Sequence, residues 1–171
     1  HHEVAVYDTD PSKTAGLLNV KVHNRLEDLK DFKAEMLLNA VSLYQTREAF
    51  ESILPFLDSG CVLADIASVK GELPDLYKKY GHPFISTHPM FGPHSGSMEA
   101  LREENAIIIR ESDSSARPIF LELFASIGVR VLEFSFAEHD EMMGYSLSTP
   151  FITSLLFGAC VDTTAVPGTN F

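Results

Sequence analysis

The chain contains 171 residues, of which 45% are hydrophobic and 22% charged, so it can bury the core of one domain, or of one domain and part of another. The net charge of -11 argues against a nucleic-acid partner, because binding to a phosphate backbone requires clustered Lys and Arg. The most apolar segment, residues 151–161, is too short to cross a bilayer, so we expect a cytoplasmic protein with no membrane partner.

Short apolar segments alternate with helix-like segments along most of the chain. Strands are predicted at residues 4–7, 21–24, 36–41, 61–66, 84–87, 105–110 and 129–134, and helices at 26–32, 46–57, 69–80 and 116–127. Residues 36–41 are almost continuously apolar, which is typical of a strand buried on both faces of a parallel sheet. The alternation predicts an α/β fold, a Rossmann-like, doubly wound and mostly parallel sheet.

A long apolar helix is predicted at residues 137–165, with a bend or break at Pro150. A helix that is apolar on most sides requires burial, so we expect it to leave the sheet domain and enter a helical one at a subunit interface. We therefore predict a dinucleotide-binding domain at residues 1–136. Residues 137–171 would begin an all-helical substrate and dimerisation domain, so that the protein forms a homodimer.

The two cysteines indicate a reducing compartment. Cys61 opens a strand-like segment, and Cys160 lies in a helix-like apolar segment far away in the sequence. This placement favours buried free thiols over a disulfide.

Asp8 follows the first predicted strand, where a dinucleotide-binding βαβ unit places the acid that binds the ribose hydroxyls. A carboxylate there repels a 2′-phosphate, and no Arg follows nearby, which favours NAD over NADP. The alternative is that Asp8 or Asp10 only caps a turn or a helix. The diagnostic glycine-rich loop is expected about 20 residues before Asp8, so we expect that loop and its strand to be missing from this chain.

Polar residues follow three neighbouring strands, at 39–42, 65–70 and 87–89, and should meet at the carboxyl edge of the sheet. Ser68 and His88 follow adjacent strands, which lie about 4.8 Å apart, so we expect a hydrogen bond between them. A histidine at this edge can transfer a proton near neutral pH, although it can also merely satisfy a turn. Because the Gly-x-Ser-x-Gly pattern is absent around Ser68, its hydroxyl is expected to orient His88 rather than to act as a nucleophile.

Two further residues are candidates for the same site. Lys70 can hold an anion, or it can be a solvated surface charge. His139 lies at the start of the long helix and shares a helical face with Ser146, which can look across a cleft at His88 or can be ordinary surface. The sequence has no His-x-x-x-His or Cys-x-x-Cys spacing, so we expect no metal site.

These segments resemble the prephenate dehydrogenase family, including its arogenate-using members. The resemblance rests on Ser-Val-Lys at residues 68–70, His-Pro-Met-Phe-Gly at 88–92 and Glu-His-Asp at 138–140, in this order and spacing over residues 4–171. It implies an NAD(P)-dependent oxidative decarboxylation in tyrosine biosynthesis. Prephenate would give 4-hydroxyphenylpyruvate, or arogenate would give tyrosine.

The resemblance also implies residue roles. His88 would be the general base that takes the proton of the ring 4-hydroxyl while hydride leaves the same carbon, and Ser68 would orient His88 and the nicotinamide. The residues expected to bind substrate are Lys70, His94, His139 and Ser146. Those expected to bind the cofactor are Asp8, Asn39, Val41, Asp65 and Ser68.

The chain departs from the family's pattern in the substrate pocket. Relatives often carry histidines where this chain has Ser148 and Phe151, and an acid where it has His94. The family's substrate-binding arginine is expected beyond residue 171, so we expect the chain to be inactive by itself. The alternatives are another nicotinamide-dependent hydroxy-acid dehydrogenase, or a non-catalytic regulatory module on the same fold. The first usually needs a lysine base that residues 145–161 lack, and the combination of Ser68, His88 and His139 argues against the second.

Overall fold

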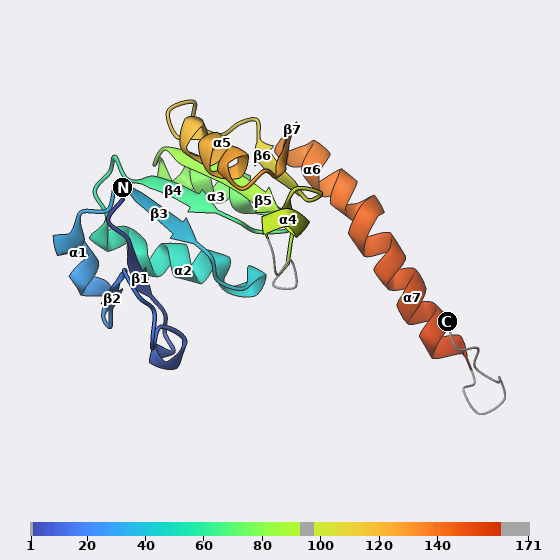
Figure 1. Cartoon of the computed structure of the whole chain (residues 1–171), viewed down its shortest axis with the longest axis horizontal. Coiled ribbons are helices and arrows are strands. Elements are labelled where there is room, and N and C mark those ends of the chain that lie inside the picture. The colour runs from blue at the N-terminus through green and yellow to red at the C-terminus, as the bar shows by residue number, and fades with distance from the viewer. Residues whose placement is uncertain (1, 93–97, 162–171) are drawn as a thin grey trace.

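The computed structural model describes residues 2–92 and 98–161, without the side chain of Met98, and within them the strands form two sheets (Figure 1). One is a two-stranded sheet of β1 and β2, and the other has five strands in the order β3-β4-β5-β6-β7. The strands are β1 (Ala5–Tyr7), β2 (Lys21–His23), β3 (Met36–Asn39), β4 (Val62–Asp65), β5 (Phe84–Pro89), β6 (Asn105–Ile109) and β7 (Arg130–Phe134).

Helices connect most of these strands. The α-helices are α1 (Leu29–Phe32), α2 (Thr46–Ile53), α3 (Leu73–Tyr80), α4 (Met98–Leu101), α5 (Arg117–Ser126), α6 (Phe136–Met143) and α7 (Thr149–Cys160). Short 3-10 helices are η1 (Pro11–Lys13), η2 (Leu26–Asp28), η3 (Leu43–Gln45) and η4 (Leu54–Phe56), and η5 (Gly144–Ser148) is a π-helix.

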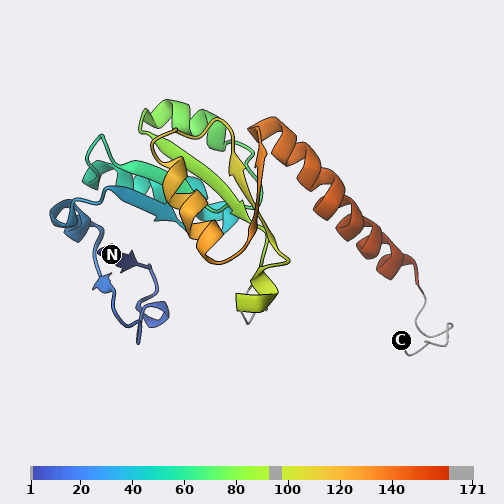
Figure 2. The same ribbon diagram turned by 45° about the horizontal axis from the view of Figure 1, so that its top comes forward.

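The prediction of a doubly wound, mostly parallel fold is confirmed. Neighbouring strands are parallel throughout, except that β5 and β6 are antiparallel. Because strand side chains alternate, Leu63 packs with α2, α3 and α6 on one face, whereas Ala64 and Ile85 pack with α5 on the other. Helices thus cover both faces of the five-stranded sheet, with α3 and α5 on opposite sides (Figure 2).

Strand β3 is less buried than its apolar sequence predicts. Leu38 is 48% exposed, because β3 is the edge of the five-stranded sheet and is not hydrogen-bonded to β1. Within the described residues no strand pairs with the outer edge of β3, so its apolar composition is not matched by burial there.

The predicted break at Pro150 is wrong. α6, η5 and α7 follow one another in a single line that leaves the sheet (Figures 1 and 2). In the wider π-helix the Thr149 N–H bonds to the Gly144 carbonyl, and Pro150 then falls in the first turn of α7, where its missing N–H costs no hydrogen bond. The helix therefore continues past Pro150, because the preceding π-helix accommodates the missing N–H of the proline.

The surface of α7 is apolar and has no cover from the described residues. Exposed fractions of 54–71% are found for Phe151, Ile152, Leu155, Leu156 and Phe157. Cys160 is exposed for the same reason, which corrects the expectation that it is buried, whereas Cys61 is buried and both thiols are free. No helix within residues 2–92 and 98–161 is long and apolar enough to span a membrane.

Candidate active site

His88 lies within β5, not after it. β4 pairs with β5 only as far as Asp65 opposite Ser86, and the last three residues of β5 pair with β6, where His88 lies opposite Ile107. The sequence predicted that the strand ends at Thr87, because Pro89 is unusual in a strand. The antiparallel β6 extends the strand, so the backbone of His88 is held by the sheet while its side chain projects beyond the end of β4.

Helix α6 covers the imidazole of His88, which is only 5% exposed. By strand alternation His88 lies on the same face as Phe84, whose ring packs against Phe136 of α6 at 6.1 Å between centroids. A capping box fixes where α6 begins. The Ser135 hydroxyl accepts from the Glu138 N–H at 3.2 Å, and the Glu138 carboxylate accepts from the Ser135 N–H at 2.7 Å.

This start of α6 places His139 against His88. Their nearest nitrogens, His88 Nδ1 and His139 Nε2, are 3.0 Å apart, and His139 Nδ1 lies 2.9 Å from Asp140 Oδ1. His139 is completely buried, so the structure does not support the surface alternative. We call these three side chains the His88–His139–Asp140 row. In the row, His139 contacts His88 directly and faces no solvent.

Asp140 also joins α6 to the loop after β4. Its Oδ1 accepts from the Lys70 N–H at 2.9 Å, and its Oδ2 accepts from the Gly71 N–H at 2.7 Å. Sequence reasoning did not single out Asp140. The available signal was an acid adjacent to the candidate histidine at a helix start.

The side chain of Lys70 points into the protein. Its Nζ donates to Asp65 Oδ1 and to the Thr87 carbonyl, both at 2.7 Å, and the Tyr77 hydroxyl donates to Asp65 Oδ2 at 2.6 Å. Lys70 is 1% exposed and Asp65 0%. We expected Lys70 to bind substrate and Asp65 to bind the cofactor, but here both charges are internal. In the structure their side chains form a cross-link between β4 and β5, and their roles toward a ligand stay predictions.

The electrostatics keep the histidines of the row neutral near pH 7. Burial lowers the pKa of His88 to about 4, positive charge on Lys70, and on His139 when that residue is protonated, acts in the same direction, and Asp65 opposes them. Burial also lowers the pKa of His139, against its bond to Asp140. For Asp140, burial alone would raise the pKa, but the amides of Lys70 and Gly71 and the bond from His139 outweigh it and lower the pKa. The row is thus two neutral imidazoles ending on a carboxylate.

The remaining substrate candidates are not gathered around His88. Ser68 lies exposed in the turn after β4, and residues 2–92 and 98–161 contain no hydrogen bond between it and His88. The Ser146 hydroxyl donates to the carbonyl of Met142 in its own helix at 2.8 Å and is exposed. His94 lies outside the described residues. The roles of Ser68, Ser146 and His94 stay predictions.

The cofactor candidates differ in what they can offer. Asp8 directly follows β1, its Oδ1 accepts from the Asp10 N–H at 2.8 Å, and it lies 3.9 Å from the ammonium of Lys13. Asn39 is occupied within the turn after β3, where its amide donates to the Thr46 carbonyl at 3.0 Å and accepts from the Val41 N–H at 3.3 Å. Val41 itself is 46% exposed. Asp8 therefore keeps acceptor capacity for a ligand, whereas the side chain of Asn39 shapes the turn.

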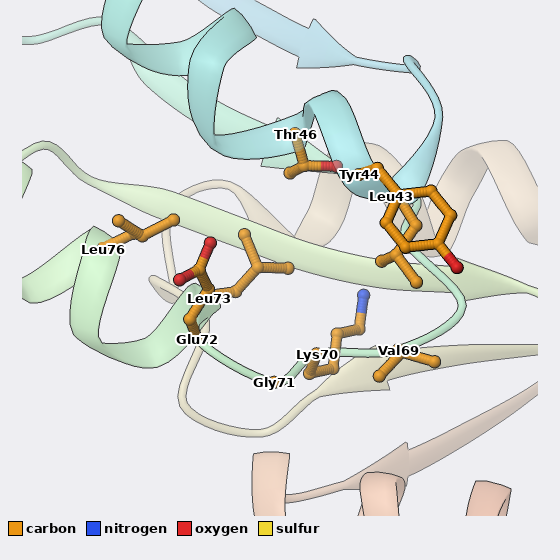
Figure 3. Close-up of a pocket in the computed structure, with 9 residues that line it drawn as sticks. All are labelled: Leu43, Tyr44, Thr46, Val69, Lys70, Gly71, Glu72, Leu73 and Leu76. Atoms are coloured by element: carbon orange, nitrogen blue, oxygen red, sulfur yellow. The ribbon is translucent and has the colours of Figure 1, made fainter.

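A pocket of about 320 Å³ lies at the carboxyl ends of β3 and β4 (Figure 3). Its two walls are the segment after β3, with Leu43, Tyr44 and Thr46, and the loop that runs from Val69 into α3. Tyr44 is 97% exposed and Val69 43%, so apolar side chains face solvent at the edge where open α/β sheets bind ligands. Sequence reasoning missed Tyr44, although its position directly after a strand was a usable signal.

Comparison with known proteins is consistent with this geometry. Residues 1–132 match the family described as prephenate dehydrogenase, nucleotide-binding domain. Arogenate dehydrogenase 1 of Arabidopsis thaliana, chloroplastic by its name, is 31% identical over 89% of this chain and 25% of that protein. The T-protein of Enterobacter agglomerans is 30% identical over 73% of this chain and 33% of that protein. The chain therefore spans only about a quarter to a third of the length of these relatives.

A solved structure shows the same fold. Prephenate dehydrogenase from Aquifex aeolicus, in complex with hydroxyphenyl propionate and NAD+, superposes with a TM-score of 0.81 at 20% sequence identity. The match covers 100% of this chain and 67% of the other.

Replacing Lys70 by Met should destabilise the fold by about 3–5 kcal/mol, because it leaves the buried carboxylate of Asp65 without its cation. Denaturant unfolding of the purified protein measures this. Lys79→Met is the matched control, since Lys79 pairs with Glu51 at an exposed site and such pairs contribute little. Equal effects of the two substitutions would contradict the role of the buried pair.

Stability should also fall as the pH is lowered from about 6.5 to about 4. In this window the unfolded chain binds a proton at His88 that the folded chain excludes, so folding loses up to about 3 kcal/mol, and nothing further from this group below pH 4. The free energy of unfolding, measured at several pH values, should vary less in His88→Asn than in the unchanged protein. A pH dependence that is identical in the two would show that His88 is not the titrating group.

Proposed function

The chain belongs to the prephenate dehydrogenase family, and we propose that the protein containing it catalyses the oxidative decarboxylation of prephenate or arogenate with NAD. The observation that carries the proposal is the position and the neutral state of the His88 imidazole. This neutral imidazole is held by the pairing of β5 with β6 beyond the end of β4, which supports a role at the carboxyl edge of the sheet, where the cofactor is proposed to bind.

His88 has the properties of a general base for this reaction. Its depressed pKa keeps it unprotonated at neutral pH, and its Nε2 makes no hydrogen bond to any other residue within 2–92 or 98–161. The imidazole would take the proton of the ring hydroxyl, so that the carbonyl forms as the ring carbon is oxidised. Loss of CO2 then makes the ring aromatic, which supplies a large thermodynamic pull. General base assistance of this kind contributes about 10²–10⁴-fold in rate.

A nicotinamide cofactor, when bound, supplies the hydride acceptor. We assign its adenosine ribose to Asp8, because a carboxylate accepts two hydrogen bonds from a vicinal diol. Tyr44 and Val69 would cover a ring and exclude water at the edge of the sheet. Ser68, exposed in the turn after β4, is assigned to orient the substrate or the nicotinamide. The ammonium of Lys13 lies near Asp8 and offsets part of its negative charge, so the preference for NAD over NADP has to be measured.

The helical part of the proposal concerns α7. Residues 1–136 would form the dinucleotide-binding domain, and residues 137–171 would begin the helical substrate and dimerisation domain of a homodimer. The exposed apolar side chains of α7, such as Phe151 and Phe157, support this assignment, because so much apolar surface is rarely left in water.

Substituting His88 by Asn in the full-length protein should lower kcat by about 10²–10⁴-fold while leaving NAD affinity unchanged, because the base is lost and the nucleotide contacts remain. Turnover is followed by the absorbance of the reduced cofactor, with prephenate or arogenate and with NAD or NADP. His82→Asn is the matched control, because His82 lies just before the amino end of β5, whereas His88 lies near its carboxyl end. Turnover by His88→Asn at the level of the unchanged protein would refute the assignment.

Substituting Asp8 by Asn should weaken NAD binding about tenfold to a hundredfold, because hydrogen bonds to a charged group are worth more than those to a neutral amide. The same change should improve binding of NADP relative to NAD, since it removes the negative charge opposite the 2′-position. Titration of each cofactor into the full-length protein measures both. Asp10→Asn, at the N-cap of η1, is the control. An unchanged ratio of the two affinities would remove Asp8 from the ribose site.

A further inference from the structure

The hydrogen atoms of the His88–His139–Asp140 row can be placed by exclusion. An ionised carboxylate only accepts, so Asp140 Oδ1 requires the proton of the contact to be on His139 Nδ1. A neutral imidazole with its proton on Nδ1 has a free lone pair on Nε2, and that atom faces His88 Nδ1 at 3.0 Å. His88 Nδ1 must therefore donate, which leaves His88 Nε2 without a proton.

Two backbone amides hold the carboxylate of Asp140 as an acceptor in the His88–His139–Asp140 row. Two successive backbone N–H groups, of Lys70 and Gly71, donate to its two oxygens at 2.9 and 2.7 Å. Donors on both oxygens favour the ionised carboxylate and prevent rotation of the group. The direction of donation, from His88 to His139 to Asp140, is thus fixed by backbone amides and not by a titratable partner.

We propose that His139 and Asp140 are positioning residues that hold His88 in the tautomer with its lone pair on Nε2 and stabilise the imidazolium formed when His88 takes a proton. The proposal rests on the proposed function, in which His88 is the base, and it replaces the expectation that His139 binds substrate. His139 is completely buried between the two other members of the row and offers no surface to a substrate.

The arrangement extends the logic of a triad, in which a buried acid fixes the tautomer of a catalytic imidazole. Here a second imidazole stands between the acid and the base. When His88 is protonated on Nε2, its Nδ1–H bond to His139 becomes charge-assisted and stronger, and the charge of Asp140 opposes the new cation through His139. The other charges near His88 are Lys70 and Asp65, which are paired with each other at 2.7 Å and largely cancel.

Two substitutions of His139 separate its two proposed effects on His88, which are to fix the tautomer and to stabilise the imidazolium. In the full-length protein, His139→Gln keeps an oxygen that can accept from His88 Nδ1–H but breaks the link to Asp140, whereas His139→Leu leaves that N–H without an acceptor. We expect kcat to fall about tenfold to a hundredfold in His139→Leu and by less in His139→Gln. Glu141→Gln, on an exposed residue of the same helix, should keep the kcat of the unchanged protein.

The pH profile gives a readout that a merely structural role would not move. Because the link to Asp140 stabilises the protonated form of His88, breaking it in His139→Gln should shift the acid limb of kcat/KM to lower pH. An unmoved limb would mean that His139 only fills space. A limb moved to higher pH would mean that His139 acts on His88 as a competing positive charge. Either result overturns the proposal.

The tautomer itself can be observed without turnover. Histidine labelled with ¹⁵N in the full-length protein distinguishes protonated from unprotonated ring nitrogens, and His88 is identified by the signal lost in His88→Asn. We expect Nδ1 to carry the proton of His88 at neutral pH, and a proton on Nε2 would refute the proposal. If the unchanged protein oxidises neither substrate, the proposed function fails, whereas this measurement still decides the order of donation in the row.

Discussion

Lys70 joins the three elements that form the site. Its ammonium bonds to Asp65 of β4 and to the Thr87 carbonyl of β5, while its backbone N–H bonds to Asp140 of α6. A buried cation is costly unless its partners are in place, since moving an ion out of water costs several kcal/mol. The folded state therefore accepts Lys70 only when β4, β5 and α6 are correctly aligned. The same residue thereby holds the backbone beside His88 and the helix that carries His139.

The antiparallel β6 gives His88 its position. The sequence predicted that the strand ends at Thr87, close to the point where the pairing of β5 with β4 stops. Because residues 87–89 pair with β6, β5 continues past its last pair with β4, Ser86 opposite Asp65, and carries His88 beyond the end of β4. Helix α6 covers the side chain of His88 and contacts it with a second histidine, His139, instead of a hydrophobic side chain.

Local sequence patterns predicted the architecture and the strand that carries His88, but they did not predict that Lys70 pairs with Asp65 inside the protein. Alternating apolar segments predicted the strands, most of the helices and the mostly parallel sheet, and they placed His88 near the carboxyl end of its strand, although the strand extends to Pro89. The direction of the Lys70 side chain and the burial of His139 depend on how α6 meets the sheet, which no local pattern encodes. The one usable local signal was the capping box of Ser135 and Glu138, which fixes the start of α6 and therefore the register of His139.

The exposure of Leu38 and the continuity of the helix past Pro150 have a similar origin. Strand β3 has the composition of a central strand, but its exposure depends on which strand lies beside it and not on its own residues. Pro150 breaks a regular α-helix, yet the preceding π-turn removes the hydrogen bond that the proline would have interrupted. In both places the local prediction was chemically sound, and a non-local or irregular feature determined the outcome.

The unbroken helix links the row to the apolar surface of α7. Asp140 pins the start of α6 to the amides of Lys70 and Gly71, and a helix transmits displacement because its backbone hydrogen bonds keep a rise of about 1.5 Å per residue. The partner proposed for α7 would contact the same continuous helix that carries His139. The other side of the 3.0 Å contact between the two imidazoles is the backbone of His88, which is held in the sheet by its pairing with β6.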